Sequence, residues 1–129
     1  MSAAKEDYIA YRIAKSDEVF ADEALLALNN RWNSCVNRLY YSSFYLVSAL
    51  LYRSGIKADT HNGAKTQFFQ HFVKTGAVPA EQGKLYTHLF DWRQESDYAD
   101  FIEFDGPTIK PMLEKVSAFN LLLKSLIKK

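Results

Sequence analysis

Apolar side chains recur three or four positions apart along most of the chain, which is the spacing of one face of an α-helix. No segment alternates apolar and polar residues at every second position, so the pattern favours helices throughout. It predicts five of them: one from Ala4 to Asn29, one from Asn33 or Ser34 to Ser54, one that begins after Asn62 and ends at Gly76, one from Pro79 to about Asp100, and one that Pro107 or Pro111 opens.

Short breaks separate the predicted helices. Gly55 is placed to end the second helix, and either Thr60 or Asn62 is placed to cap the third. Short connections favour antiparallel neighbours. We therefore expect an all-α, up-and-down bundle of about five helices, with the third a shorter insertion, forming one domain over residues 1–129.

The apolar stripes predict how the helices pack. The stripe of the first helix contains Tyr8, Tyr11, Val19, Ala21, Leu25, Leu26 and Leu28. The second helix is the most apolar and carries Tyr40, Tyr41, Phe44 and Tyr45, so we expect it at the centre of the bundle or at an interface. Together with an aromatic content of 15%, this favours a homodimer.

Composition narrows the class of protein. With 48% hydrophobic and 24% charged residues, the chain has the balance of a globular protein. Its net charge of +1 predicts no global attraction to polyanions. The single cysteine, Cys35, excludes an internal disulfide framework and a cysteine-based zinc site. The charged N-terminal segment lacks the apolar core of a signal peptide, and the longest apolar run, 44–52, is too short for a membrane span. We expect a cytoplasmic protein.

Few residues are candidates for metal binding or nucleophilic catalysis. The three histidines, His61, His71 and His88, are not three or four positions apart, so the helical ligand pairs of metal centres are absent, and we expect no metal or cofactor. Cys35 lies just inside the second helix, where the helix dipole lowers thiol pKa values, but a small core residue is the simpler interpretation.

Polar residues interrupt the apolar faces of the second and fourth predicted helices. Arg93 and Asp97 are four positions apart and share a helix face, which Tyr98 flanks. Such a pair is usually solvated and weak, but Arg93 follows aromatic residues closely, and a buried guanidinium needs a partner. Arginine also suits forked recognition of phosphate or carboxylate. The candidate ligand-binding residues are Asn37, Arg38, Tyr41, Arg93 and Tyr98.

Four short motifs lie in order in the middle of the chain: Asn-Arg-x-Tyr-Tyr at 37–41, Thr-His-x-Gly at 60–63, Phe-Val-Lys-Thr-Gly at 72–76 and Arg-x-x-x-Asp-Tyr at 93–98. They resemble the HEPN domain family, in particular its small stand-alone bacterial and archaeal group. The resemblance spans Tyr8 to the C-terminal end and is only compositional in the outer helices. It implies an up-and-down bundle of four to five helices, commonly a homodimer.

The resemblance also implies an activity. Many family members are ribonucleases or toxins paired with small nucleotidyltransferase antitoxins, and their activity depends on an arginine followed, four to six residues later, by a histidine. No metal is required, since arginine stabilises phosphate charge while histidine moves protons during attack by the RNA 2′-hydroxyl. Arg93 matches the arginine, but Asp97, Tyr98 and Ala99 occupy the histidine positions. Neither aspartate nor tyrosine exchanges protons near neutral pH as histidine does.

Three functions from different classes follow. The first is a module that binds a nucleotide or RNA phosphate at a polar cluster between the central helices, at a dimer cleft. The second is a toxin-like, metal-independent ribonuclease of a toxin–antitoxin or defence module, whose candidate catalytic residues are Arg93, Asp97, Tyr98 and, from outside that helix, His61. The third is a non-catalytic structural or regulatory dimer. The expected partners are a second copy, a nucleotide or RNA, and a nucleotidyltransferase-type antitoxin.

Overall fold

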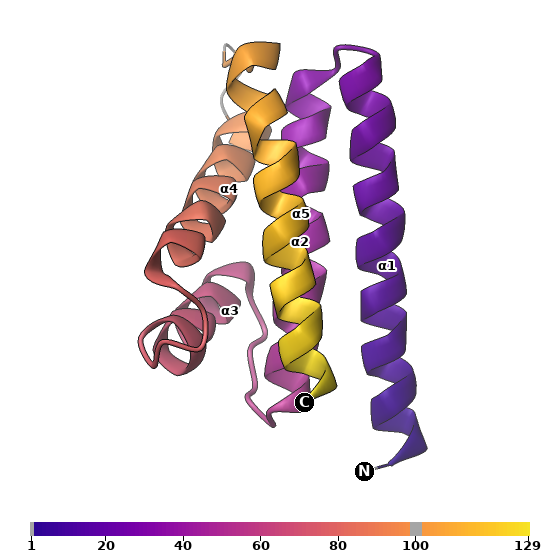
Figure 1. Ribbon diagram of the computed structural model, residues 1–129, viewed down its shortest axis with the longest axis vertical. Helices are drawn as coiled ribbons and strands as arrows, with labels where there is room; N and C mark the ends of the chain where they lie inside the picture. Colours follow the sequence, from indigo (N-terminus) through magenta and orange to yellow (C-terminus); the bar gives the residue numbers. More distant parts are fainter. Residues whose placement is uncertain (1, 99–101) are drawn as a thin grey trace.

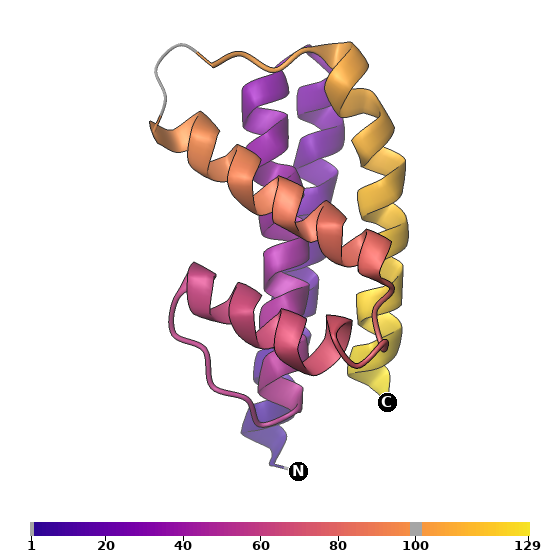
Figure 2. The same ribbon diagram turned by 90° about the vertical axis from the view of Figure 1, so that its left-hand side faces the viewer.

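Helices make up all the regular structure in the described part of the chain. The computed structural model describes residues 2–98 and 102–129, with α1 (Ala3–Leu28), α2 (Trp32–Arg53), α3 (His61–Phe68), the π-helical turn η1 (Phe69–Val73), α4 (Ala80–Tyr98) and α5 (Gly106–Lys128). The long helices α1, α2 and α5 run side by side, and both chain ends lie at the same end of the bundle (Figure 1). α4 slants across α2, and α3 with η1 lies crosswise beneath it (Figure 2). The predicted all-α, up-and-down bundle is confirmed.

α2 is the central helix. Half of its residues are buried, and it contacts each of the other four α-helices. Its neighbours cover it on several sides because its apolar residues extend around most of its circumference. None of the helices in the described residues has both the length and the apolar composition to cross a membrane.

A buried polar network joins α1, α2 and α5. Ser16 of α1 donates from Oγ to the carbonyl oxygen of Ser42 on α2 at 2.6 Å. Asn120 of α5 donates from Nδ2 to Oγ of Ser42 at 3.1 Å, and its Oδ1 accepts from Oγ of Ser43 at 2.8 Å. All four residues are buried, and a satisfied network of this kind fixes how the three helices are placed along one another.

The predicted buried stripe of α1 is too wide. Tyr11, Leu25 and Leu28 are exposed, and so is Ala21. The buried residues of α1 are instead Ile9, Ser16, Val19 and Glu23, which form a narrow seam. The reason is that α1 lies at the edge of the bundle and packs mainly against α2, and a helix with one main neighbour buries a narrower stripe than a helix enclosed by several.

α2 starts near the predicted position, but neither Asn33 nor Ser34, the two plausible N-cap residues, caps it. The helix begins at Trp32, and its N-cap residue, Arg31, makes no side-chain capping bond. The Asn33 side chain bonds to the connection between α4 and α5 instead. Its Nδ2 donates to the carbonyl oxygen of Ile102 at 3.0 Å, and its Oδ1 accepts from the N–H of Phe104 at 2.8 Å. Asn33, whose side chain is of a type that often caps helices, therefore makes a tertiary contact instead of a local cap.

The start of α3 is close to the predicted one, and its end is not. Thr60 is the N-cap residue, as one of the two predicted alternatives, and its Oγ1 accepts from the N–H of Gly63 at 2.8 Å. The helix begins at His61 and ends as an α-helix at Phe68, before the π-helical turn. Gly76, the predicted end, has a positive φ of 86°. The cap fixes the backbone at the start of α3, where His61 is the first helical residue.

The other helix ends follow the predictions. Gly55 has a φ of 73° directly after the C-cap of α2, a conformation that favours glycine. α5 begins at Gly106, with Pro107 in its first turn, and is capped by Asp105, whose Oδ1 accepts from the N–H of Thr108 at 2.9 Å. The predicted end of the fourth helix at about Asp100 lies outside the described residues.

Candidate functional site

Arg93 is a buried cation on α4. Only 7% of its surface is exposed. Its Nη1 lies 3.3 Å from Oδ2 of Asp97, one turn further along the helix. The guanidinium carbon lies 5.0 Å from the centre of the Tyr40 ring and 5.9 Å from that of Phe90, within the range of cation–π attraction. Nε has no hydrogen-bond partner among the described residues. The Arg93–Asp97 pair is therefore not an ordinary solvated ion pair.

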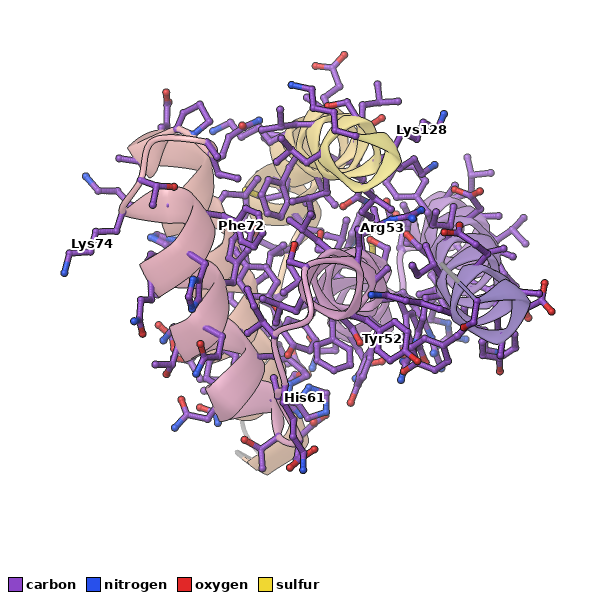
Figure 3. All side chains as sticks on the ribbon, turned by 90° about the horizontal axis from the view of Figure 1, so that it is seen from below. Tyr52, Arg53, His61, Phe72, Lys74 and Lys128 are labelled. Carbon is purple, nitrogen blue, oxygen red and sulfur yellow. The ribbon has the colours of Figure 1, made fainter. Side chains whose placement is uncertain are left out.

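His61 reaches the same place from α3. Its Nδ1 lies 2.9 Å from the hydroxyl oxygen of Tyr40, and its ring centre lies 4.3 Å from that of Phe44. Figure 3 shows the imidazole at the start of α3, on the side that faces α2. Tyr40 is fully buried and contacts His61 with its hydroxyl and Arg93 with its ring face. We call these residues the Arg93 cluster: Tyr40, His61, Arg93 and Asp97.

The charges on α4 act on His61. Burial is the main cause that lowers the pKa of His61 below its ordinary value of 6.5, the Arg93 cation lowers it further, and the Asp97 carboxylate opposes both. His61 is therefore mostly neutral at pH 7. Burial raises the pKa of Tyr40 to about 12, so its hydroxyl keeps its proton at that pH. The cluster combines a fixed cation, a carboxylate and a neutral imidazole.

A polar hollow of about 230 Å³ opens beside the cluster, between the N-terminal half of α2 and the C-terminal half of α4. Asp97 belongs to both the hollow and the cluster. Arg38 is exposed and Asn37 is half-buried, so Arg38 lies on the solvent side of the hollow and not in the buried cluster. The lining residues are Asn33, Ser34, Asn37, Arg38, Ser96 and Asp97.

The structure brings together most, but not all, of the sequence-predicted site residues. Arg93, Asp97 and His61 meet in the cluster, and Tyr41 lies beside His61 with their ring centres 5.7 Å apart. The Tyr98 side chain lies outside the part of the chain that the structure describes. Tyr40 was expected only as a packing residue. The signal that could have found it is its position one turn from Asn37 and Phe44 on the most aromatic helix.

Cys35 does not belong to the site. It is fully buried, and its Sγ donates to the backbone carbonyl oxygen of Glu23 at 3.6 Å. Burial, and to a smaller extent the nearby Glu23, raises the pKa of Cys35 to about 12. The start of α2 therefore does not activate the thiol, and the interpretation of Cys35 as a core residue is correct.

In residues 2–98 and 102–129, no group of three or more histidine, cysteine, aspartate or glutamate side chains is placed to bind a metal ion.

Comparison with known proteins covers almost the whole chain. The family model described as the HEPN domain matches residues 9–126. A UPF0332 protein of Thermotoga maritima is 39% identical over 123 residues, which are 95% of this chain and 93% of that protein. Two proteins of Methanocaldococcus jannaschii that carry the name "Putative toxin", MJ0142 and MJ0605, are 34% and 27% identical, over 84% and 72% of this chain and 78% and 66% of their own lengths. The predicted family resemblance is confirmed.

Proposed function

The chain belongs to the HEPN domain family, and on that premise we propose that it is a toxin-like member that binds the phosphate of a nucleotide or RNA strand at the Arg93 cluster and the adjoining hollow. The observation that carries the proposal is the state of Arg93. Its guanidinium is buried, one partly exposed carboxylate is its ionic partner, and Nε has no partner among the described residues. A forked acceptor such as phosphate suits such a group.

The charge around the hollow supports an anionic ligand. The lining of the hollow carries one positive charge, on Arg38, and one negative charge, on Asp97. Arg93, the buried ionic partner of Asp97, adds a second positive charge behind the lining. Asn37 and Ser34 add neutral hydrogen-bonding side chains at the rim. Together, the lining and Arg93 have an excess of one positive charge, which attracts anions more strongly here than on an open surface because the surrounding protein screens charges less than water does.

Ligand binding should stabilise the folded protein. We expect a saturating nucleotide or short single-stranded RNA to raise the melting temperature by roughly 5–10 °C, and Arg93→Ala to abolish that rise. The measurement is a thermal melt at low salt with phosphate, AMP, ATP and a short RNA. Arg53→Ala is a matched control, since it removes an arginine that pairs with Glu6 at the opposite end of α2, and it should keep the ligand-dependent rise.

Two outcomes would contradict the proposal. If no ligand shifts the melting temperature of the wild-type protein, the hollow does not bind phosphate. If Arg93→Ala lowers the melting temperature by several degrees and no ligand has an effect on either protein, the cluster only joins α2 and α4. The protein would then be the non-catalytic structural or regulatory dimer.

A homodimer is part of the proposal. The exposed apolar side chains Tyr11, Leu25 and Leu28 on α1 and Leu121 on α5 offer surface for a second copy. We expect light scattering at micromolar concentration to give twice the chain mass of 14.8 kDa. A particle of 14.8 kDa would contradict the dimer. The thermal melts would then test whether a single chain binds phosphate.

Two further expectations belong to the same proposal. A nucleotidyltransferase-type antitoxin is the partner that the family resemblance implies. Co-purification of such a protein with this chain from its native cells would support this partner. Its absence from the gene neighbourhood and from pull-downs would oppose it.

A cytoplasmic location is expected from composition and the single cysteine. Recovery of the protein in an extracellular or periplasmic fraction would contradict it.

The ribonuclease is the second candidate function. The observation that favours it is the presence of His61 in the Arg93 cluster. α4 carries the arginine without a histidine at the expected spacing. His61 of α3 contacts the hydroxyl of Tyr40, whose ring lies against that arginine. Whether this histidine moves protons decides between binding alone and cleavage.

A further inference from the structure

We propose that a second pocket, between α1, the C-terminal half of α2 and the connection from α2 to α3, binds an uncharged planar aromatic ring of the size of an indole or a purine base. We call it the aromatic pocket. Its volume is about 270 Å³. It shares no lining residue with the polar hollow beside the Arg93 cluster. The aromatic pocket is therefore a separate site, and ring binding there does not depend on phosphate binding at Arg93.

Three aromatic side chains line the pocket: Tyr8 from α1, and Phe44 and Tyr52 from α2. The ring centres of Tyr8 and Tyr52 lie 4.5 Å apart, and their planes are tilted by 48°. Tilted rings do not cover one another's faces, so a third ring has an aromatic surface to lie against in an offset or edge-on arrangement. Tyr52 is 43% exposed, and Figure 3 shows it on the same side of α2 as His61.

The polarity of the lining favours a ligand without charge. Leu51 and Ala64 are buried and give the pocket an apolar floor. Lys57 and Asp59 are exposed, and their opposite charges lie 3.9 Å apart. Because each charge has a counterpart beside it, the rim selects neither an anion nor a cation. Burial of apolar surface and ring contacts are the interactions that the pocket offers.

The volume limits the size of the ligand. An apolar cavity of about 150 Å³ holds one benzene ring, and pockets for drug-sized ligands begin at about 300 Å³. A pocket of about 270 Å³ lies between these values, so one ring or two fused rings fit it.

The two tyrosines are held in place before a ligand arrives. Nε of Arg12 donates to the hydroxyl oxygen of Tyr8 at 2.8 Å, and its guanidinium carbon lies 5.1 Å from the centre of that ring. Nζ of Lys5 lies 5.7 Å from the centre of the Tyr52 ring. A ligand that meets walls already in position loses less free energy to ordering side chains.

The aromatic pocket is joined to the Arg93 cluster through the protein. Ile56 and Ala58, from the connection that leads to the Thr60 cap, form part of its lining. Phe44, which also lines it, packs against His61 with 4.3 Å between ring centres. A bound ring should therefore restrain the start of α3 and be detected at His61 as well as in the pocket.

Nuclear magnetic resonance titration with indole tests the proposal. We expect saturable shifts of the amides of residues 56–64 and of the His61 ring, with a dissociation constant on the order of 1 mM or tighter. Phenol and cyclohexanol are a matched pair of probes, since they have the same heavy-atom skeleton and only phenol is planar and aromatic. Phenol should bind several-fold more tightly than cyclohexanol.

Two variants locate the site. Ala58→Leu should fill the pocket, and Tyr52→Ala should remove one of its walls, so each should weaken indole binding by about tenfold or more. Tyr11→Ala is the matched control, because Tyr11 is an exposed tyrosine of α1 that does not line the pocket, and it should bind indole like the wild type. Circular dichroism of each variant separates loss of folding from loss of binding.

A free ring and the base of a nucleotide share this chemistry, and titrations with adenine and AMP distinguish them. If AMP binds more tightly than adenine and loses that advantage in Arg93→Ala, the pocket takes the base of a ligand held at Arg93. If AMP has no such advantage, the pocket takes a free ring. Either result supports the aromatic pocket.

Three results would overturn the proposal. The first is the absence of saturable shifts with indole up to the limit of its solubility. The second is indole binding with unchanged affinity in both Ala58→Leu and Tyr52→Ala, which would place the ring elsewhere. The third is equal affinity for phenol and cyclohexanol, which would show that the pocket does not select aromatic rings. None of these results bears on phosphate binding at Arg93, which the thermal melts test.

Discussion

Replacing Glu23 with glutamine should make the protein more stable, by an amount that grows as the pH rises from about 5 to 9. Glu23 is fully buried on α1, and neither carboxylate oxygen has a hydrogen-bond partner among the described residues. Burial raises its pKa from the ordinary 4.5 to about 9. A buried carboxyl group without a partner keeps its proton, because the charged form cannot be solvated.

The direction of the pH effect follows from where the proton is held. Below pH 4.5 both the folded and the unfolded chain hold it, so Glu23 has no pH-dependent cost there. Above that pH the unfolded chain releases the proton and the folded chain does not, so the free energy of unfolding falls until the pH passes the folded pKa of about 9. The full loss is on the order of several kcal/mol, a large part of the stability of a domain of this size.

Urea denaturation at a series of pH values measures this effect. Glu23→Gln cannot ionise, so its curve of stability against pH should be flatter than that of the wild type, with the two proteins closest at acidic pH. Asp22→Asn is the control, since Asp22 is the preceding residue and is exposed, and it should follow the wild-type curve. Identical pH dependence in Glu23→Gln and the wild type would show that Glu23 is charged in the folded protein.

Truncating Phe68 to alanine should cost about 3–5 kcal/mol of folding stability. Phe68 is fully buried where α3, α4 and α5 meet, with its ring centre 5.4 Å from that of Tyr86 and 6.1 Å from that of Phe119. The loss combines removed apolar contact with a cavity that rigid neighbours do not fill. Because α3 buries only Phe68 and Ala64, its attachment should weaken most.

Phe68→Ala should also affect the candidate site. α3 carries His61 at its first residue, so a loosened α3 should misplace the imidazole and reduce any cleavage as well. Urea denaturation gives the global loss, and hydrogen exchange of the α3 amides gives the local one. Gln70→Ala, an exposed position in η1, should change both by less than about 0.5 kcal/mol. A loss below about 1 kcal/mol for Phe68→Ala would mean that α3 does not depend on this contact.

The helices were predictable because their signals are local. Apolar spacing, the Thr60 cap and the glycine at position 55 act within a few residues of one another, so the chain sequence contains them directly. The width of the buried stripe on α1 was not predictable in this way. Leu25 and Leu28 have the spacing of core residues. They are exposed because α1 packs mainly against α2, and no second helix of the described residues covers that side.

The site was predictable only in part, because some of its contacts are local in the sequence and others join distant segments. The Arg93–Asp97 pair is one helical turn long and could be found from spacing alone. Its meeting with His61, far earlier in the chain, depends on how α3 lies against α2 and α4. The role of Tyr40 depends on that arrangement too, since a tyrosine on an apolar helix gives no sign of which hydrogen bond its hydroxyl makes.

Helical periodicity and the four motifs were sufficient to predict the all-α bundle and the HEPN family, and they identified Arg93 as a candidate site residue. Those features are encoded by residues that are neighbours in sequence. The packing of the helices decided which apolar residues are buried, that Glu23 is enclosed without a partner, and that His61 lies in the cluster with Arg93. These depend on free energies of burial and on contacts between distant segments, which exist only once the chain has folded.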